Sequence, residues 1–227
     1  MKKMILSAVM LVLAASGYAQ ETGAAGAGER NEWLPTFEAV AVDADLDVKF
    51  VRVPDTEAPK IVYDTKGSYT TKFRAEVKDK TLRISEKPDS RRPDRTEVTV
   101  YYNALRAVSL SGAAATFEGT LAAAVLDVTV NRKASLTAKL DVKDLKMEQT
   151  GYSTANLSGS VRYLSLYVST GKVAASDLEV MSAEVNAQSK AEVSLWITDR
   201  FVGKTTTNAR ISYKGDPKIV RGGAKFM

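Results

Sequence analysis

Val108-Ser-Leu-Ser-Gly112 is the first clear copy of a pattern that returns along the second half of this chain. Each copy is an alternating strand that ends in a small or polar turn, and the unit returns about every 18–20 residues, within the range of repeat architectures. The later copies are Val128-Thr-Val-Asn-Arg132, Met147-Glu-Gln-Thr-Gly151 and Leu166-Tyr-Val-Ser-Thr-Gly171, with weaker ones at Val185-Asn-Ala-Gln-Ser189 and Thr205-Thr-Thr-Asn-Ala209. The repeat therefore predicts a fold, although it does not predict a reaction.

Strands within the repeat alternate between apolar and polar residues, which is typical of a sheet with one buried face. The apolar phase includes Leu126, Val128 and Val130, then Leu145 and Met147, then Leu164, Leu166 and Val168, and after the turns Ala134, Leu136, Ala138, Leu140, Ala155 and Leu157. Consecutive copies place similar residues at similar positions, which favours an all-β parallel β-helix, a solenoid with capped ends. The alternative is an antiparallel β-sandwich.

The first half of the chain is also rich in predicted strands. Residues 37–53 alternate without interruption, with Val40, Val42, Leu46 and Val48 in one phase, and are predicted as one strand. Further strands are predicted over 61–63, 73–77, 82–84 and 96–102, with a tight turn at Asp79-Lys80. The mature chain is therefore expected to be almost entirely β.

The N-terminus has the organisation of a secretory signal peptide, predicted over residues 1–19. Lys2 and Lys3 precede an apolar run over 4–15, and a small-x-small cleavage site ends at Ala19. The run is shorter than the roughly 20 residues of a membrane span, and no transmembrane segment is predicted in the mature chain. Residues 20–32 are predicted as a flexible leader and 33–227 as a single β-helical domain. Within that domain, 33–95 form an N-terminal cap with irregular strands and 96–222 form the regular rungs.

Composition narrows both the chemistry and the compartment. The chain has no histidine and no cysteine, which removes histidine-dependent nucleophiles, thiol chemistry and thiolate metal sites. The formal net charge of +5 falls to +3 once Lys2 and Lys3 are cleaved, too mild to predict a nucleic-acid partner. Neither a cofactor nor a catalytic residue is predicted. Export without disulfides fits the periplasm or cell surface of a Gram-negative bacterium.

Three outward aromatic residues are candidate ligand-binding residues. Tyr163 and Tyr167 lie in the phase opposite to Leu164 and Leu166, and Trp196 lies opposite to its own apolar neighbours. Exposed aromatic rings stack on sugar rings or anchor a protein partner, although isolated exposed aromatics are also common on ordinary surfaces. The tyrosines and Trp196 are not required to lie on the same sheet.

Two polar rows complete the set of candidate sites. By alignment of the repeats, Thr129, Glu148, Tyr167 and Asn186 form one column, which is either a shallow polar groove or an ordinary solvated face. Asp43, Asp45 and Asp47 form the best carboxylate cluster, a weak candidate for a hard cation, because a calcium loop curves whereas this segment is predicted to be extended. A solvated strand face is the competing interpretation of these aspartates.

A resemblance to a known family covers residues 37–222. It is carried by Phe37-Glu-Ala-Val-Ala-Val-Asp-Ala-Asp-Leu-Asp-Val48, Lys80-Thr-Leu-Arg-Ile84, Val98-Thr-Val-Tyr-Tyr-Asn-Ala-Leu105, Val108-Ser-Leu-Ser-Gly-Ala113 and Ile211-Ser-Tyr-Lys-Gly-Asp-Pro217. These stretches resemble exported Bacteroidetes proteins described as putative auto-transporter adhesin, head GIN domain. The resemblance implies a right-handed parallel β-helix and surface adhesion or glycan contact, and it brings no catalytic residues. Asn131-Arg132 and Ser189-Lys190 depart from the Ser-Gly turns usual in that family.

Three functions follow as hypotheses. The first is an exported, non-enzymatic binding or adhesion module that presents an elongated surface to a glycan or to a cell-surface or envelope protein. The second is a polysaccharide-active enzyme, a lyase or hydrolase, on the same fold. The third is a periplasmic envelope or lipid-handling factor. This hypothesis predicts an apolar, concave interior instead of a filled core.

Overall fold

The computed structural model describes residues 29–65, 72–88, 94–206, 208–223 and 225–226, so the predicted signal peptide lies outside the described residues. Within these ranges the chain is all β and contains no helix, which confirms the predicted class. The strands are β1 Glu29–Trp33, β2 Ala39–Asp43, β3 Asp47–Arg52, β4 Lys60–Asp64, β5 Phe73–Lys78, β6 Thr81–Glu86, β7 Glu97–Tyr102, β8 Ala107–Ser111, β9 Ala114–Asn131, β10 Ser135–Thr205, β11 Arg210–Lys214, β12 Ile219–Gly222 and β13 Lys225–Phe226. They form one curled sheet of mixed orientation.

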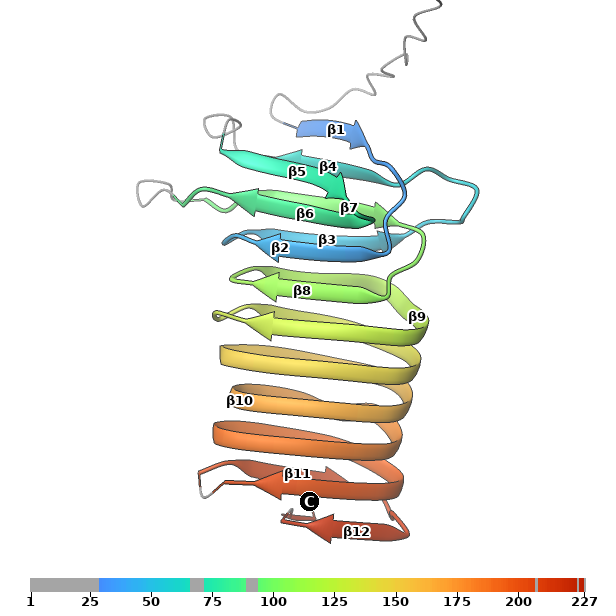
Figure 1. The fold of residues 1–227 in the computed structure, drawn as a ribbon, viewed down its shortest axis with the longest axis vertical. Coiled ribbons are helices and arrows are strands. Elements are labelled where there is room, and N and C mark those ends of the chain that lie inside the picture. Colours follow the sequence, from blue (N-terminus) through green and yellow to red (C-terminus); the bar gives the residue numbers. More distant parts are fainter. Residues whose placement is uncertain (1–28, 66–71, 89–93, 207, 224, 227) are drawn as a thin grey trace, which may run out of the picture.

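Most strand pairs in this sheet are parallel, and the antiparallel pairs β1–β4, β4–β7 and β5–β6 gather at one end. In the other part the chain runs along one side, bends, and returns along the other side, so that successive passes stack along the long axis (Figure 1). We call one such circuit a rung. Met147 lies beside Val128, 19 residues earlier, and Phe201 lies beside Val220, again 19 residues away. The parallel pairing disagrees with an antiparallel sandwich.

The predicted single strand over 37–53 is wrong. The chain bends at residues 44–46, so β2 and β3 are separate strands with different neighbours. Ala44 and Leu46 stay buried through this corner, because the inward phase continues without a break. Period-two alternation is therefore identical for a straight strand and for two strands joined by a tight corner.

The order of the rungs also differs from the order of the chain. β2 pairs in parallel with both β6 and β8, and β3 pairs in parallel with both β7 and β9. The first rung in the sequence thus lies between two later ones, and the parallel pairing already includes residue 39. β1 begins at Glu29, inside the predicted leader, and pairs with β4.

The interior is filled by the predicted apolar phase. The inward residues of all rungs form one buried cluster, from Phe37 through Leu126 and Val168 to Ile211. An apolar void between Phe117, Leu126 and Met147 measures about 10 Å³, which is no more than the space a single water needs. Small inward residues such as Ala134 and Ala187 are fully buried, as expected in a narrow, close-packed interior.

Residues with positive φ mark the corners between rungs. Gly112, Gly151 and Gly171 adopt such angles, as glycine does at low cost. Arg132 and Ser189, in the two turns that lack the Ser-Gly pattern, adopt φ of 52° and 57°. The same corner geometry is therefore kept without glycine. The predicted Asp79-Lys80 turn is confirmed, because both residues have positive φ and join the antiparallel pair β5–β6.

A candidate binding surface on the outside of the sheet

A hollow of about 330 Å³ lies on the outer face of the sheet and contains Tyr163. We call it the Tyr163 hollow. Its outward side chains come from successive rungs at matching positions, as the pairing of Asp144 with Val125 shows. The lining comprises Val125, Asp144, Leu145, Lys146, Tyr163, Leu164, Ser165, Ser182, Ala183, Glu184, Arg200 and Val202.

Small side chains create this hollow. Ser165 and Ser182 lie on the rungs of Tyr163 and Glu184, where longer side chains would fill the space between the larger lining residues. The buried neighbours Leu164 and Ala183 point inward, because they belong to the apolar phase. The floor is therefore the sheet itself, and the hollow is open to solvent.

A second hollow of about 640 Å³ lies where the same rungs bend, and we call it the bend hollow. It is lined by the residues directly before those of the Tyr163 hollow, such as Arg162 before Tyr163 and Met181 before Ser182. Two consecutive exposed residues interrupt the alternation here, because the strand turns a corner. The full lining is Ala122, Ala123, Ala124, Asp141, Val142, Lys143, Ser160, Val161, Arg162, Glu179 and Met181.

The three candidate aromatic residues do not form one site. Tyr163 is 47% exposed and lines the hollow. Tyr167 is half-buried, and its hydroxyl donates to Gln188 Oε1 at 3.4 Å. Trp196 lies on the side of β10 that pairs with β11, where the ammonium of Lys214 is 5.1 Å from its ring centroid. The structure therefore separates Trp196 from Tyr163.

The strand pairing places two residues of the predicted polar column, Thr129 and Glu148, side by side in the parallel register. Asn186 accepts a hydrogen bond from Gln188 Nε2 at 3.4 Å, and Gln188 also contacts Tyr167. This column runs beside the Tyr163 hollow without lining it. Alternation alone did not find Asp144, Glu184 and Arg200. Asp144 and Arg200 do occupy the same rung position as Val125, Tyr163 and Ser182, which was a usable signal.

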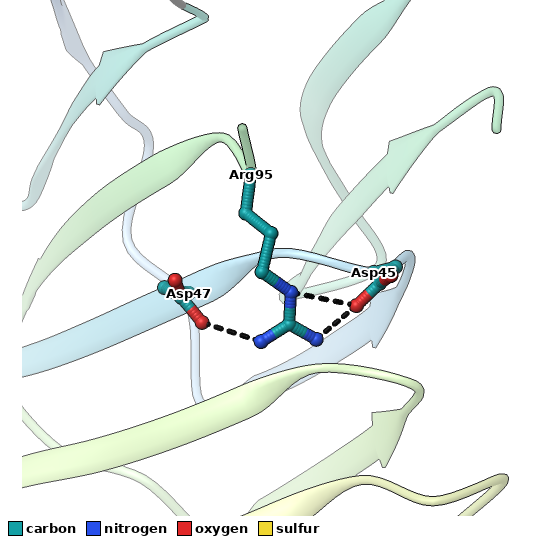
Figure 2. A network of polar contacts seen from close by, with 3 residues as sticks. All are labelled: Asp45, Asp47 and Arg95. Atoms are coloured by element: carbon teal, nitrogen blue, oxygen red, sulfur yellow. Dashed lines mark hydrogen bonds and ion pairs between the residues drawn. The ribbon is translucent and has the colours of Figure 1, made fainter. Parts of the chain in front are cut away.

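The three candidate aspartates engage arginines. The guanidinium of Arg95 lies between Asp45 and Asp47, with Nε 2.8 Å from Asp45 Oδ1 and Nη1 2.7 Å from Asp47 Oδ1 (Figure 2). Asp43 accepts from Ser111 Oγ at 3.0 Å and pairs with Arg132 at 3.1 Å. Burial alone would lower the pKa of Arg95, but hydrogen bonds and charge from Asp45 and Asp47 outweigh burial and raise that pKa. No group of three acidic residues fit to hold a metal ion occurs in the described part of the chain.

We expect Arg95→Ala to lower the free energy of unfolding by about 1 kcal/mol, because two partly exposed ion pairs are lost. Urea denaturation followed by circular dichroism measures the change. Calcium titration of the same variant tests the aspartates, since the substitution frees Asp45 and Asp47. A calcium-dependent rise in Tm for the variant alone would show that Arg95 takes the place of a cation. No rise would mean that Arg95 only joins Asp45 and Asp47 through ion pairs.

The fold and its outward hollows define a class of repetitive all-β proteins whose open concavities lie on the outer surface of the sheet. Within that class, the chain belongs to the family described as putative auto-transporter adhesin, head GIN domain, whose model matches residues 36–217. The resemblance found in the sequence is thus confirmed. No curated protein matches the chain. Among the described residues, no helix has the length and hydrophobicity to cross a membrane.

Several solved structures share this fold. A putative adhesin from Bacteroides fragilis NCTC 9343 has a TM-score of 0.79 at 18% identity, covering 88% of this chain and 93% of its own. A putative adhesin from Parabacteroides merdae ATCC 43184 has a TM-score of 0.68 at 17% identity, covering 88% and 95%. A putative lipid binding protein from Parabacteroides distasonis ATCC 8503 has a TM-score of 0.58 at 16% identity, covering 88% and 97%. At these identities the likeness shows the fold alone.

Proposed function

We propose that this protein is an exported, non-enzymatic adhesion module that binds a glycan or a cell-envelope partner through its outer surface. One observation carries the proposal: the inward side chains of the described residues form one packed cluster with a void of about 10 Å³, whereas hollows of about 330 and 640 Å³ lie on the outer surface. The adhesin family supports the same function. That void is too small for a lipid chain, so lipid handling is not part of the proposal.

We also propose that the chain forms a right-handed parallel β-helix and that it is exported. Parallel pairing at intervals of 18 to 21 residues supports a parallel β-helix, and parallel crossovers within one sheet are right-handed in nearly all proteins. Such a coil presents an elongated surface. The predicted signal peptide and the adhesin family support export to the periplasm or surface of a Gram-negative cell.

One observation favours a second candidate, a polysaccharide-active enzyme. Asp144 and Glu184 line the same hollow, as the two carboxylates of a glycosidase do. They belong to rungs two apart, so their backbones are separated by about 10 Å along the axis and by a further step along the strand. Glycosidase carboxyl groups lie roughly 5–9.5 Å apart, so hydrolysis at this site requires both side chains to lean toward each other across the intervening rung.

A binding assay with a parallel activity assay separates the two functions. We expect the labelled mature chain to be retained on a glycan array or on cell-envelope fractions, with no sugar product released from the same glycans. Release of product that is lost in Asp144→Asn or Glu184→Gln would establish the enzyme instead. No retention on any glycan or envelope fraction would refute the adhesion function.

A further inference from the structure

The Tyr163 hollow crosses five successive rungs. Its outward residues Val125, Asp144, Tyr163, Ser182 and Arg200 come one from each rung. Neighbouring strands lie about 4.8 Å apart, so the four intervals span roughly 19 Å along the long axis. A ligand that fills this hollow is therefore chain-like and runs across the strands.

The middle of the hollow is uncharged. Tyr163 supplies a half-exposed ring, while Ser165 and Ser182 supply two hydroxyl groups beside it. An aromatic ring beside small hydroxyl groups suits a sugar, because the apolar face of the sugar packs on the ring and its hydroxyls exchange hydrogen bonds with the serines.

The charges around the hollow balance. Asp144 and Lys146 flank one end, and Glu184 and Arg200 flank the other. Within the described residues none of these four side chains forms an ion pair or a side-chain hydrogen bond, whereas Asp45, Asp47 and Arg95 are engaged with one another. The four groups are thus free to contact a ligand, and their balance favours an uncharged ligand over a polyanion or a polycation.

The charges around the bend hollow also balance. This hollow carries two acidic and two basic side chains, which are Asp141, Glu179, Lys143 and Arg162. The floor of the Tyr163 hollow is a sheet face whose strands already pair with their neighbours, as 144–149 do with 125–130. A peptide therefore cannot add to it as a further strand. Recognition at this surface depends on side chains alone.

We propose that the Tyr163 hollow binds an uncharged, chain-like glycan that lies along the long axis of the molecule, with one sugar ring packed on Tyr163. The proposal rests on the adhesion function and names the ligand class of its site. Asp144 and Glu184 accept hydrogen bonds from sugar hydroxyls, and Lys146 and Arg200 donate to ring and hydroxyl oxygens. Because the ligand carries no charge, its binding changes little with salt.

The test uses the mature chain and an array of neutral oligosaccharides that includes cellohexaose, xylohexaose and chitohexaose, with hexagalacturonate as the acidic counterpart. Kd is measured by calorimetry for the best neutral glycan. We expect Tyr163→Ala to raise Kd about tenfold, and Ser165→Tyr, which fills the hollow, to do so at least as strongly. Tyr152→Ala is the matched control, because Tyr152 is 67% exposed and lies outside both hollows; its Kd should stay within about twofold of the wild type.

Unchanged Tm values show that the variants fold, since Tyr163 and Ser165 are on the outer face. A neutral glycan whose Kd responds to Tyr163→Ala and Ser165→Tyr, but not to Tyr152→Ala or to added salt, supports the proposal. Equal binding by all variants, a preference for hexagalacturonate, or retention on a protein partner without any neutral glycan overturns it. In each of those cases the adhesion function stands. It falls if nothing at all is retained, or if a sugar product is released and that release is lost in Asp144→Asn or Glu184→Gln.

Discussion

Gly159→Ala is expected to destabilise the protein by about 4 kcal/mol, which combines backbone strain with overlap between rungs. Gly159 has φ of +101°, and a Cβ at this position would overlap the carbonyl oxygen of Leu140 on the preceding rung. The neighbouring strand cannot move away, because hydrogen bonds between the rungs fix the spacing. Thermal unfolding followed by circular dichroism should show a Tm lower by roughly 10 °C.

Gly119→Ala is the matched control for this prediction. Gly119 also has positive φ, at +78°, but a Cβ there would meet no atom within 4 Å. Only the cost of the left-handed backbone remains, about 1 kcal/mol. If both substitutions lowered Tm equally, the prediction that overlap between the rungs at Gly159 adds to the backbone cost would be wrong.

Phe50→Ala is expected to lower the free energy of unfolding by about 4 kcal/mol, because it removes a large, fully buried ring. Phe50 stacks on Phe117 at 4.5 Å between ring centroids, and meets Tyr102 edge-on at 6.4 Å. These rings come from β3, β9 and β7, three adjacent strands of the stack. Paired neighbours on both sides of β3 limit the collapse of the cavity. Urea denaturation measures the loss.

Lys49→Ala is the matched control, because it substitutes an outward residue of the same strand, β3. Lys49 points outward, and its ammonium lies 3.6 Å from the carboxylate of Glu118 in an exposed pair. Such pairs contribute about 0.5 kcal/mol. A loss at Phe50 no greater than that at Lys49 would mean that the three-ring cluster is not part of the cooperative core.

The inward phase of the chain was predictable from the sequence, because burial in a sheet follows directly from alternation. Val128, Met147 and Leu166 are buried as predicted, and so is Val40 in the first half. The Asp79-Lys80 turn was also predictable, because a short polar pair between two alternating strands indicates a hairpin. Both residues have the positive φ that a tight hairpin turn requires. The candidate site was only partly predictable: Tyr163 was identified, but its neighbours were not.

What the sequence determined by itself is the all-β class, the inward face of each strand and the family, because each depends on residues close together in the chain. The tertiary structure decided which rungs are neighbours, so that β2 lies between β6 and β8 although neither follows it directly. It also decided that Asp144, Tyr163, Glu184 and Arg200 meet in one hollow while Trp196 lies elsewhere. The physical reason is that an outward side chain has no buried partner to fix its place, and its surroundings are set by the register between rungs.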